Sequence, residues 1–514
     1  MHRHCSVPIP LVLLFSSVAV SAASAGTITW SGPHSPCGAT LQACIDAASP
    51  GDVIEVATNV PIYEDLTIDK SLVLTAALGF SPVLGDPHFV ILSNPDPLAN
   101  QIRFEYFTVT RGFVYALQTS GGTFDVGIQY LTIQNAFDGR PEIQVGTGSP
   151  GSFGRVQAGI VGNRLTIPPN SQSFGASAIV LEGGHAASLS GLIQGNRIDH
   201  FDGGQEGAIG VFNLDAALDV TVVANEIRGS DYNEGVKLFQ FGNGSSNVRF
   251  LDNLVVGQTN ESGGPASYGV SISSGSATFE IVNNTAADGD NGIGVSGRDD
   301  LGASWSGVVA NNIVSGMTAL GISIAQPELT SGVVENDHNL VFDVGFNGFT
   351  PGPGTLFQDP LFIGGGNYRL TDPSPARNAG SDARVPSDLT TDLDVNPRMV
   401  GRVDMGAYES SSLVAALPAS YQQYRLHPNA PNPFQLSTTI RYELPRPEYV
   451  RLGVFDARGR LVRWLVSGAF QESGLQVANW DGRGEHGRPM ASGIYFYRLE
   501  AGRFLDTRRM VLLQ

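Results

Sequence analysis

The sequence predicts an all-β protein in which a right-handed parallel β-helix is followed by a small immunoglobulin-like β-sandwich. Three observations support this fold class. Apolar and asparagine positions recur with a period of roughly 23 to 34 residues, which is typical of a solenoid. Glycine is frequent, at 63 of 514 residues, and only 15% of residues are charged. The sign of the net charge also changes near residue 425, which indicates two domains.

Composition also limits the function. The hydrophobic content of 42% is enough for a substantial core. The net charge of −18 argues against a nucleic-acid partner. Nothing in the composition indicates an oligomer, and we expect a monomer.

The first 25 residues have the layout of a secretory signal peptide, with cleavage after Ala25. His2, Arg3 and His4 precede an apolar run at 11–15, and small residues follow at 23–25. The alternative is a membrane anchor, but the run is too short to span a bilayer. We therefore expect a secreted or outer-surface bacterial protein. In that oxidising compartment Cys37 and Cys44 favour a disulfide over a metal site, because no further ligand lies nearby in the sequence.

Asparagines mark the repeat of the β-helix. Their spacings are 33, 29, 28, 31 and 27 residues, and the positions three before and two after each one are apolar. We expect them to occupy sharp left-handed turns and to hydrogen-bond to their copies in the next coil, with ligand binding as the alternative. The six are Asn163, Asn196, Asn225, Asn253, Asn284 and Asn311.

A second set of strands has the same period and alternates with period 2, which puts its apolar members on one face. Two strands per period with Gly, Asn and Asp turns favour the β-helix over helical solenoids and propellers. The copies begin at Ala178, Ala208, Gly235, Gly269, Gly292 and Gly321.

Residues before the repeat predict its beginning. Leu41–Ala48 can form a short apolar helix that plugs the open end of the solenoid. The segments 53–56, 66–68 and 72–74 are expected to be strands of the first coil.

Two segments resemble secreted bacterial right-handed β-helix proteins with a pectate-lyase-like solenoid. One is Ser49–Ser71, and the other is 357–409, which contains Asp359-Pro360, Asn378-Ala379-Gly380 and Val403–Glu409. The second segment is similar to the final coils of the choice-of-anchor proteins, whose C-terminal attachment modules vary. Asn378 departs from the aspartate that is usual there. The resemblance implies a β-helix over 26–409 with an N-terminal cap.

The C-terminal region predicts a β-sandwich over 426–514 after a linker at 410–425. Residues 426–514 contain 12 Arg and 8 acids, whereas 26–424 contain 16 bases and 40 acids. Strands are expected at 438–444, 450–455, 461–465, 476–480, 494–499 and 509–513.

Three motifs in this region resemble two related families. They are Asn429–Phe434, Trp480-Asp481-Gly482 and Ser492–Tyr495. The families are the immunoglobulin-like domain of flagellar hook-capping proteins and the C-terminal sorting domain of type IX secretion cargo. The second resemblance implies outer-membrane secretion machinery as a partner and attachment to the cell surface. The alternative is a passive spacer.

Catalytic and metal motifs are weak in this sequence. No spaced His/Cys metal motif, nucleophile elbow, phosphate loop or dinucleotide fingerprint stands in context. Asp288–Gly292 superficially resembles a calcium loop but lacks the downstream Glu, so we expect a turn and no cofactor, with calcium as an alternative that no specific motif supports.

The candidate site is the outward face of the second strand set. Phe212 and Phe239 are one coil apart and should stack beside Glu182 and Lys237, which suits the apolar face and hydroxyls of a sugar ring. Loops entering these strands carry the acids Asp202, Glu206, Asp231 and Glu234.

Three interpretations of this face remain open. One is a carbohydrate-binding or adhesive surface that binds an extracellular glycan. Another is a polysaccharide lyase or glycoside hydrolase, whose chemistry needs paired acids or a base. The third is a solvated, non-catalytic face of a structural surface protein.

Overall fold

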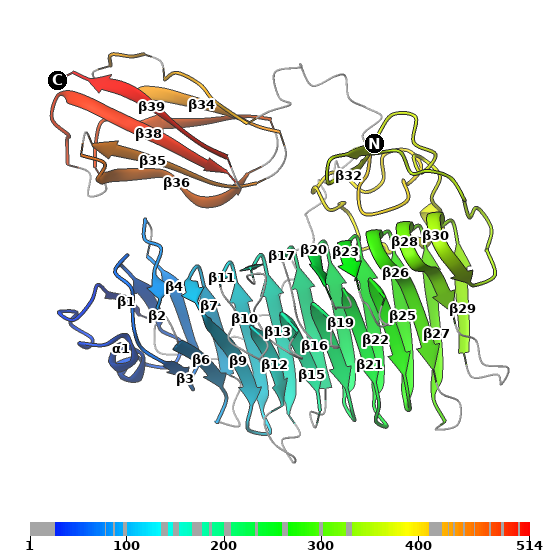
Figure 1. Cartoon of the computed structure of the whole chain (residues 1–514). Coiled ribbons are helices and arrows are strands. Elements are labelled where there is room, and N and C mark those ends of the chain that lie inside the picture. The colour runs from blue at the N-terminus through cyan, green and yellow to red at the C-terminus, as the bar shows by residue number, and fades with distance from the viewer. Residues whose placement is uncertain are drawn as a thin grey trace, which may run out of the picture. The chain divides into compact units, whose positions relative to one another are not determined.

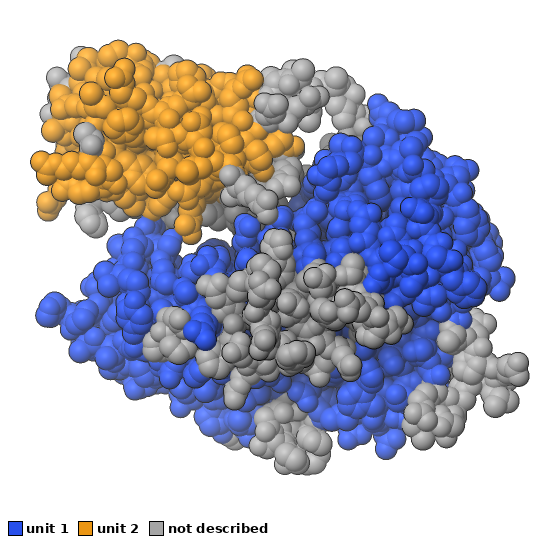
Figure 2. Space-filling model, viewed as in Figure 1, with its two compact units in different colours: residues 1–410 blue, residues 411–514 orange. Residues whose placement is uncertain are grey.

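The chain divides into two compact units, residues 1–410 and 411–514 (Figure 2). The predicted signal peptide and the linker residues 411–423 lie outside the described part of this computed structural model. The structure describes residues 26–513 except 78, 86–87, 96–99, 135–141, 148–153, 167–176, 185–187, 200–206, 232–234, 260–265, 298–301, 325–331, 411–423, 430, 435–436, 446–447, 457, 472–473, 485–487 and 502–503.

The first unit is a parallel β-solenoid, which confirms the predicted fold class (Figure 1). One face is a sheet of 12 strands in parallel register from coil to coil. Its strands are β1 (Thr27–Trp30), β2 (Val53–Val56), β4 (Leu72–Ala76), β7 (Asn100–Glu105), β10 (Thr123–Gln129), β13 (Arg155–Val161), β16 (Ser188–Gln194), β19 (Ala217–Val223), β22 (Ser245–Leu251), β25 (Ser276–Val282), β27 (Ser304–Ala310) and β29 (Gly332–Asp337).

The other two faces are linked into one 18-stranded sheet because the last long strands run across both. The second face holds β5 (Val83–Leu84), β8 (Thr108–Thr110), β11 (Thr132–Gln134), β14 (Arg164–Thr166), β17 (Arg197–Asp199), β20 (Glu226–Asp231) and β23 (Leu254–Thr259). The third face holds β3 (Leu66–Ile68), β6 (His88–Ser93), β9 (Gly112–Gln118), β12 (Ile143–Thr147), β15 (Ile179–Gly183), β18 (Ile209–Asn213), β21 (Val236–Gln240) and β24 (Tyr268–Ile272). The strands that cross both faces are β26 (Thr285–Gly297), β28 (Ile313–Ile324) and β30 (Leu340–Gly348).

The asparagine ladder lies inside the solenoid, at the corner between the first and second faces. Each side-chain oxygen accepts a bond from the backbone and the side-chain amide of the previous member, as Asn196 does from Asn163 at 2.9 Å. The predicted coil-to-coil bonding is therefore confirmed. The full ladder is Asn163, Asn196, Asn225, Asn253, Asn284, Asn312 and Asn339.

Two details of the predicted ladder are wrong. The sixth member is Asn312, not Asn311, so Val309 and Val314 point into the core in place of Val308 and Ile313. The left-handed residue is also not the ladder asparagine but the residue before it, such as Gly195 or Asn311. Adjacent asparagines at 311 and 312 made the register ambiguous in the sequence.

The N-terminal end of the solenoid is closed by helix α1 (Leu41–Ala47), as predicted (Figure 1). Thr40 caps it by accepting a bond from the Ala43 amide at 3.0 Å. Leu41, Cys44 and Ile45 are fully buried in the main core. The helix therefore covers the first core layer, which a solenoid must hide from water.

Residues 357–409 do not form final coils, contrary to expectation. The last pairing between strands of the solenoid is that of β28 with β30. Residues 357–409 contain the short antiparallel pair β31 (Phe362–Gly364) and β32 (Asn367–Leu370), the 3-10 turn η2 (Asp382–Arg384) and an isolated antiparallel bridge between Thr391 and Pro397. The segment instead folds back over the ladder corner, where Leu389 packs on Leu251 and Val282. We call residues 357–409 the return segment.

The second unit is a small antiparallel β-sandwich with its own core. One sheet contains three strands and the other four, and both contribute buried side chains to one cluster that includes Tyr442, Trp480 and Tyr497. The strands are β33 (Arg425–Leu426), β34 (Thr438–Leu444) and β37 (Gly474–Trp480), and β36 (Leu461–Gln471), β35 (Glu448–Asp456), β38 (Gly493–Ala501) and β39 (Phe504–Leu512).

Candidate functional site

The predicted aromatic face is assembled on the third face of the solenoid. Strand register places Glu182 of β15 beside Phe212 of β18, and Phe212 beside Phe239 of β21. The two rings stack with centroids 6.4 Å apart and planes inclined by 22°. The Lys237 Nζ lies 4.6 Å from the Phe239 ring centroid. We call Glu182, Phe212, Lys237 and Phe239 the aromatic face.

The environment of this face differs from the expectation in two respects. Its four side chains are half-buried rather than fully exposed. The predicted copy that begins at Gly269 is also out of register, because β24 pairs two residues earlier than the sequence repeat indicated and Ser271 therefore lies beside Phe239. Phe241 extends the aromatic surface, since its ring lies 5.1 Å from that of Phe239 and it is 39% exposed.

Most of the predicted loop acids lie outside the described residues. These are Asp202, Glu206 and Glu234. Asp231 ends strand β20, and its side chain is outside the described part. Glu182 accepts a bond from the Gln144 amide at 3.1 Å, which fixes its carboxylate at the margin of the aromatic face.

The cysteine pair and the calcium-like segment that begins at Asp288 were also singled out in the sequence. Cys37 and Cys44 form a disulfide beside the N-terminal helix. Asp288 lies within strand β26 at a left-handed position, not in a separate turn, and accepts a bond from the Tyr368 hydroxyl at 2.6 Å.

Within the described ranges, no group of three or more His, Cys, Asp or Glu side chains is arranged to hold a metal ion. Among the same residues, no helix is long and apolar enough to cross a membrane.

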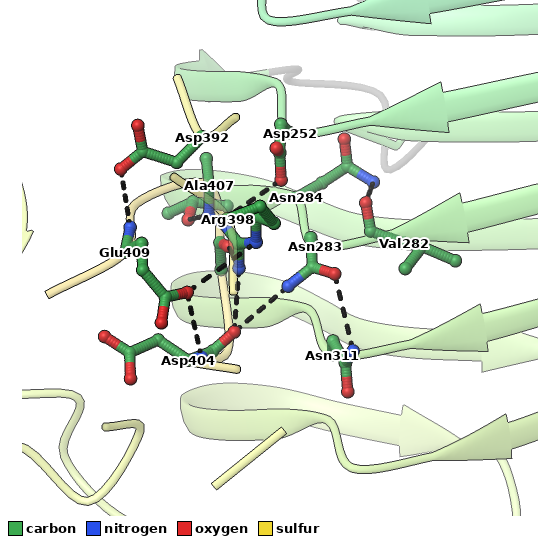
Figure 3. A network of polar contacts seen from close by, with 12 residues as sticks. Asp252, Val282, Asn283, Asn284, Asn311, Asp392, Arg398, Asp404, Ala407 and Glu409 are labelled. Carbon is green, nitrogen blue, oxygen red and sulfur yellow. Dashed lines mark hydrogen bonds and ion pairs between the residues drawn. The ribbon is translucent and has the colours of Figure 1, made fainter. Parts of the chain in front are cut away.

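A buried polar cluster, which the sequence did not reveal, attaches the return segment to the solenoid (Figure 3). Arg398 is fully buried and donates to the backbone oxygens of Asp404 and Gly406 at 2.8 Å each. Its guanidinium also lies 3.3 Å from Asp252 Oδ1 and 3.8 Å from Glu409 Oε2. Asp252 precedes Arg398 by nearly 150 residues, so the sequence offered no local signal for this pairing.

Burial raises the pKa values of three carboxyls near Arg398. Burial raises the pKa of Glu409 to about 8 and that of Asp392 to about 6. Burial also raises the pKa of Asp252 well above its usual value, although Arg398 opposes the shift. Glu409 accepts a bond from the Asp404 backbone amide at 3.1 Å, and Asp392 accepts one from the Glu409 backbone amide at 2.7 Å. Neither carboxylate oxygen of Asp252 has a hydrogen-bond partner among the described residues, although Arg398 lies beside it.

The left-handed residues that precede the ladder form a column along the same corner. Two of its nine members are glycines, at 162 and 195, and two are tyrosines, at 106 and 130, with φ of 63° and 55°. The other five are Ala224, Asp252, Asn283, Asn311 and His338. Holding a residue other than glycine in this conformation costs about 1–2 kcal/mol. The Tyr106 and Tyr130 rings stack at 4.8 Å and 16°, and such a pair contributes about 0.5–1.5 kcal/mol beyond its buried area. One stack therefore does not offset the strain of two tyrosines.

The first face carries a shallow groove of about 570 Å³ that crosses the strands β16 to β27. Outward polar residues line it in register, and Asn247 donates to Asp219 and accepts from Thr278 at 2.9 and 2.8 Å. These side chains therefore satisfy one another.

Comparisons with known proteins support no specific assignment. No protein-family profile matches the chain, and no curated protein matches it significantly. Solved structures that match include PorZ, a surface component of the type-IX secretion system of Porphyromonas gingivalis (20% identity, 20% of this chain, 13% of that chain, TM-score 0.14). They also include the PL6 family alginate lyase AlyGC (12% identity, 75% of this chain, 59% of that chain, TM-score 0.37) and the pectate lyase Pel9A (15% identity, 75% and 97%, TM-score 0.32).

The chain therefore spans only 13% of the PorZ chain and 59% of the alginate lyase chain. The TM-scores are low, so these likenesses carry no argument about substrate or activity. The parallel solenoid is established by the strand register of the chain itself. The resemblances to choice-of-anchor proteins and to sorting domains stay predictions.

Proposed function

We propose that this protein is an extracellular or cell-surface glycan-binding protein whose aromatic face contacts the sugar. The observation that carries the proposal is the stacking of Phe212 and Phe239 on the outer side of two adjacent parallel strands. Buried aromatic residues would strengthen a core, but these rings lie on the opposite side of the strands from the core residues Val211 and Leu238.

The chemistry of the face suits a pyranose. The apolar side of a sugar ring packs on aromatic rings, and its hydroxyls need polar partners at the margin. Glu182 accepts hydrogen bonds and Lys237 donates them, and register places both next to the rings. Fixed strands hold all four side chains, so little ordering is required on binding.

The test is a glycan array followed by affinity measurement on the best glycan. Phe239→Ala is expected to weaken binding by about 1 kcal/mol or more, since stacking area is lost. Phe346→Ala is the matched control, because Phe346 is 63% exposed on β30 at the end of the solenoid. Absence of any bound glycan, or equal losses in both variants, contradicts the proposal.

The same experiment separates binding from cleavage. A polysaccharide lyase or glycoside hydrolase would bind and then shorten the glycan, and Glu182→Gln would reduce the rate of shortening. A product analysis that finds only intact glycan supports a binding protein without catalysis.

Export and anchoring form the second part of the proposal. The support is the signal-like sequence of residues 1–25 and the sorting-domain resemblance of the tail. A separately folded sandwich, with a core of its own, suits a module that engages secretion machinery.

A further inference from the structure

The outer side of the four-stranded sheet of the sandwich carries a diagonal row of arginines. Alternate residues of β35, β38 and β39 are buried in the sandwich core, so the residues between them point outward. Arg451 of β35 lies opposite Glu500, which is two residues after Arg498 on β38. Arg509 of β39 lies opposite Phe496, which is two residues before Arg498. Each arginine is therefore diagonal to the next, at about 7–8 Å, and we call the three the arginine diagonal.

The arginine diagonal has more positive charge than its surroundings compensate. Glu500 is the single acid among the described outward residues of these three strands, and its Oε1 lies 3.2 Å from Arg498 Nε. Arg451 and Arg509 are exposed, and neither forms an ion pair with a described residue. Three arginines beside one glutamate leave this side of the sheet positively charged.

Apolar side chains surround the arginine diagonal on the same side of the sheet. Trp464 lies across Gly453, where a Cβ would come within 2.8 Å of the indole ring. Phe455 meets the Trp464 ring edge-on, with the planes inclined by 83°. Ile494 and Leu505 are 46% and 62% exposed. Exposed apolar side chains that gather in one place mark protein or membrane contacts, and here they lie next to cations.

We propose that this side of the sandwich docks on the surface of an anionic lipid bilayer, through the arginine diagonal and the exposed aliphatic side chains. The contact rests on the anchoring part of the proposed function, and it gives the sandwich a lipid partner. Arginines are attracted by anionic headgroups, while leucine, isoleucine and tryptophan enter the boundary between the headgroups and the acyl chains.

The arrangement of these groups favours a bilayer over a soluble anionic chain. A sugar ring stacks on a flat aromatic surface, but Phe455 and Trp464 are nearly perpendicular. The Arg498 guanidinium also lies over the Phe455 ring, 4.4 Å from its centroid. An extended peptide adds to the edge of a sheet, whereas these side chains lie on its face. A bilayer is wide enough to contact the arginines and the aliphatic side chains of adjacent strands together.

The charges of the two units agree with this partner. Residues 426–514 contain 12 Arg and 8 acids, whereas residues 26–424 contain 16 bases and 40 acids. An anionic surface therefore attracts the sandwich and repels the solenoid. The solenoid is left free to bind its own ligand.

The test measures binding of the full chain to vesicles made of equal parts phosphatidylglycerol and phosphatidylcholine, by co-sedimentation at low salt. The double variant Arg451→Gln, Arg509→Gln is expected to weaken binding by about tenfold or more, since each arginine near an anionic surface contributes about fivefold. Sodium chloride should weaken wild-type binding, because it screens the charges. Leu505→Ser should also weaken binding, because less apolar area enters the bilayer.

The matched control is the double variant Arg425→Gln, Arg441→Gln. Both residues are exposed on the three-stranded sheet, so this variant removes the same charge from the other sheet of the sandwich. Its affinity should stay near that of the wild type. Equal losses in the two double variants would show a response to net charge alone and would overturn the proposal. Absence of wild-type binding, or full affinity in Leu505→Ser, would overturn it as well.

The lipid contact and the anchoring proposal fail in different experiments. If the full chain does not bind vesicles but truncation after residue 410 still detaches the solenoid unit from cells, the sandwich anchors through another partner and the lipid contact is excluded. If the vesicles are bound but the truncated chain stays on the cell surface, the anchoring proposal fails while the lipid contact stands.

Discussion

Each ladder asparagine from Asn163 to Asn312 links three coils of the solenoid. Asn284 donates to the backbone oxygen of Phe250 at 2.7 Å and to the side chain of Asn312 at 3.2 Å. Its own side-chain oxygen accepts from the backbone and the side-chain amide of Asn253 at 3.0 Å each. All these groups are buried, so any group left without its partner keeps the full cost of desolvation.

Asn284→Ala is therefore expected to destabilise the solenoid unit strongly. It leaves the Asn253 amide and the Asn312 side-chain oxygen short of a partner, at about 1–3 kcal/mol for each buried group. Asn247→Ala is the control, since Asn247 makes comparable bonds to Asp219 and Thr278 on the exposed outer face. Calorimetric unfolding of both variants gives the comparison. Equal shifts in the two would show that burial of the ladder contributes little.

The return segment is attached to the solenoid through a cluster of buried charged groups. Arg398 provides one positive charge to a buried region that also contains Asp252, Asp392, Asp404 and Glu409. One cation cannot compensate four ionised carboxylates in a region of low dielectric constant. The raised pKa values of Glu409 and Asp392 show how the conflict is resolved, because protonation removes part of the negative charge.

This element is expected to loosen in mild alkali. Glu409 has a usual pKa of 4.5 and a folded-state pKa of about 8. A raised carboxyl pKa means that its contribution to stability is complete below pH 4.5 and is lost as pH rises through about 8. Hydrogen exchange of residues 390–409 should therefore accelerate between pH 6 and pH 9, after correction for intrinsic rates.

Glu409→Gln should reduce that pH dependence, because an amide does not ionise. Glu335→Gln is the matched control, since Glu335 is exposed and pairs with Arg384 at 2.8 Å outside the cluster. If the exchange rates of Glu409→Gln follow the same pH course as those of the wild type, another group controls the element.

Sequence reasoning recovered the repeating strands and also the single helix predicted at 41–48, which the structure bounds at Leu41–Ala47. The strands were predicted because each coil repeats the same local pattern, and the helix was predicted from its own short apolar segment before the repeat. The direction of the return segment was not predicted, since Arg398 meets Asp252 through the fold rather than through spacing. The aromatic pair Phe212 and Phe239 was found by its one-coil spacing. The pair Tyr106 and Tyr130 has the same kind of spacing, but its left-handed backbone is visible only in the structure.

At the scale of the whole molecule, two units with separate cores carry opposite charges. Residues 26–424 have 16 bases and 40 acids, whereas residues 426–514 have 12 bases and 8 acids. The core of the solenoid and the core of the sandwich share no residue among those described. Each unit can therefore be removed without opening the core of the other.

Truncation of the chain after residue 410 tests the anchoring proposal. The shortened chain should be exported normally and should unfold at the same temperature as the solenoid transition of the full chain, since no core residue is lost. It should also appear in the medium, or remain behind the outer membrane, instead of on the cell surface. Cell fractionation with surface proteolysis distinguishes these locations. A truncated chain that stays attached to the surface would show that the sandwich is a spacer, and a lowered unfolding temperature would show that the two units stabilise each other.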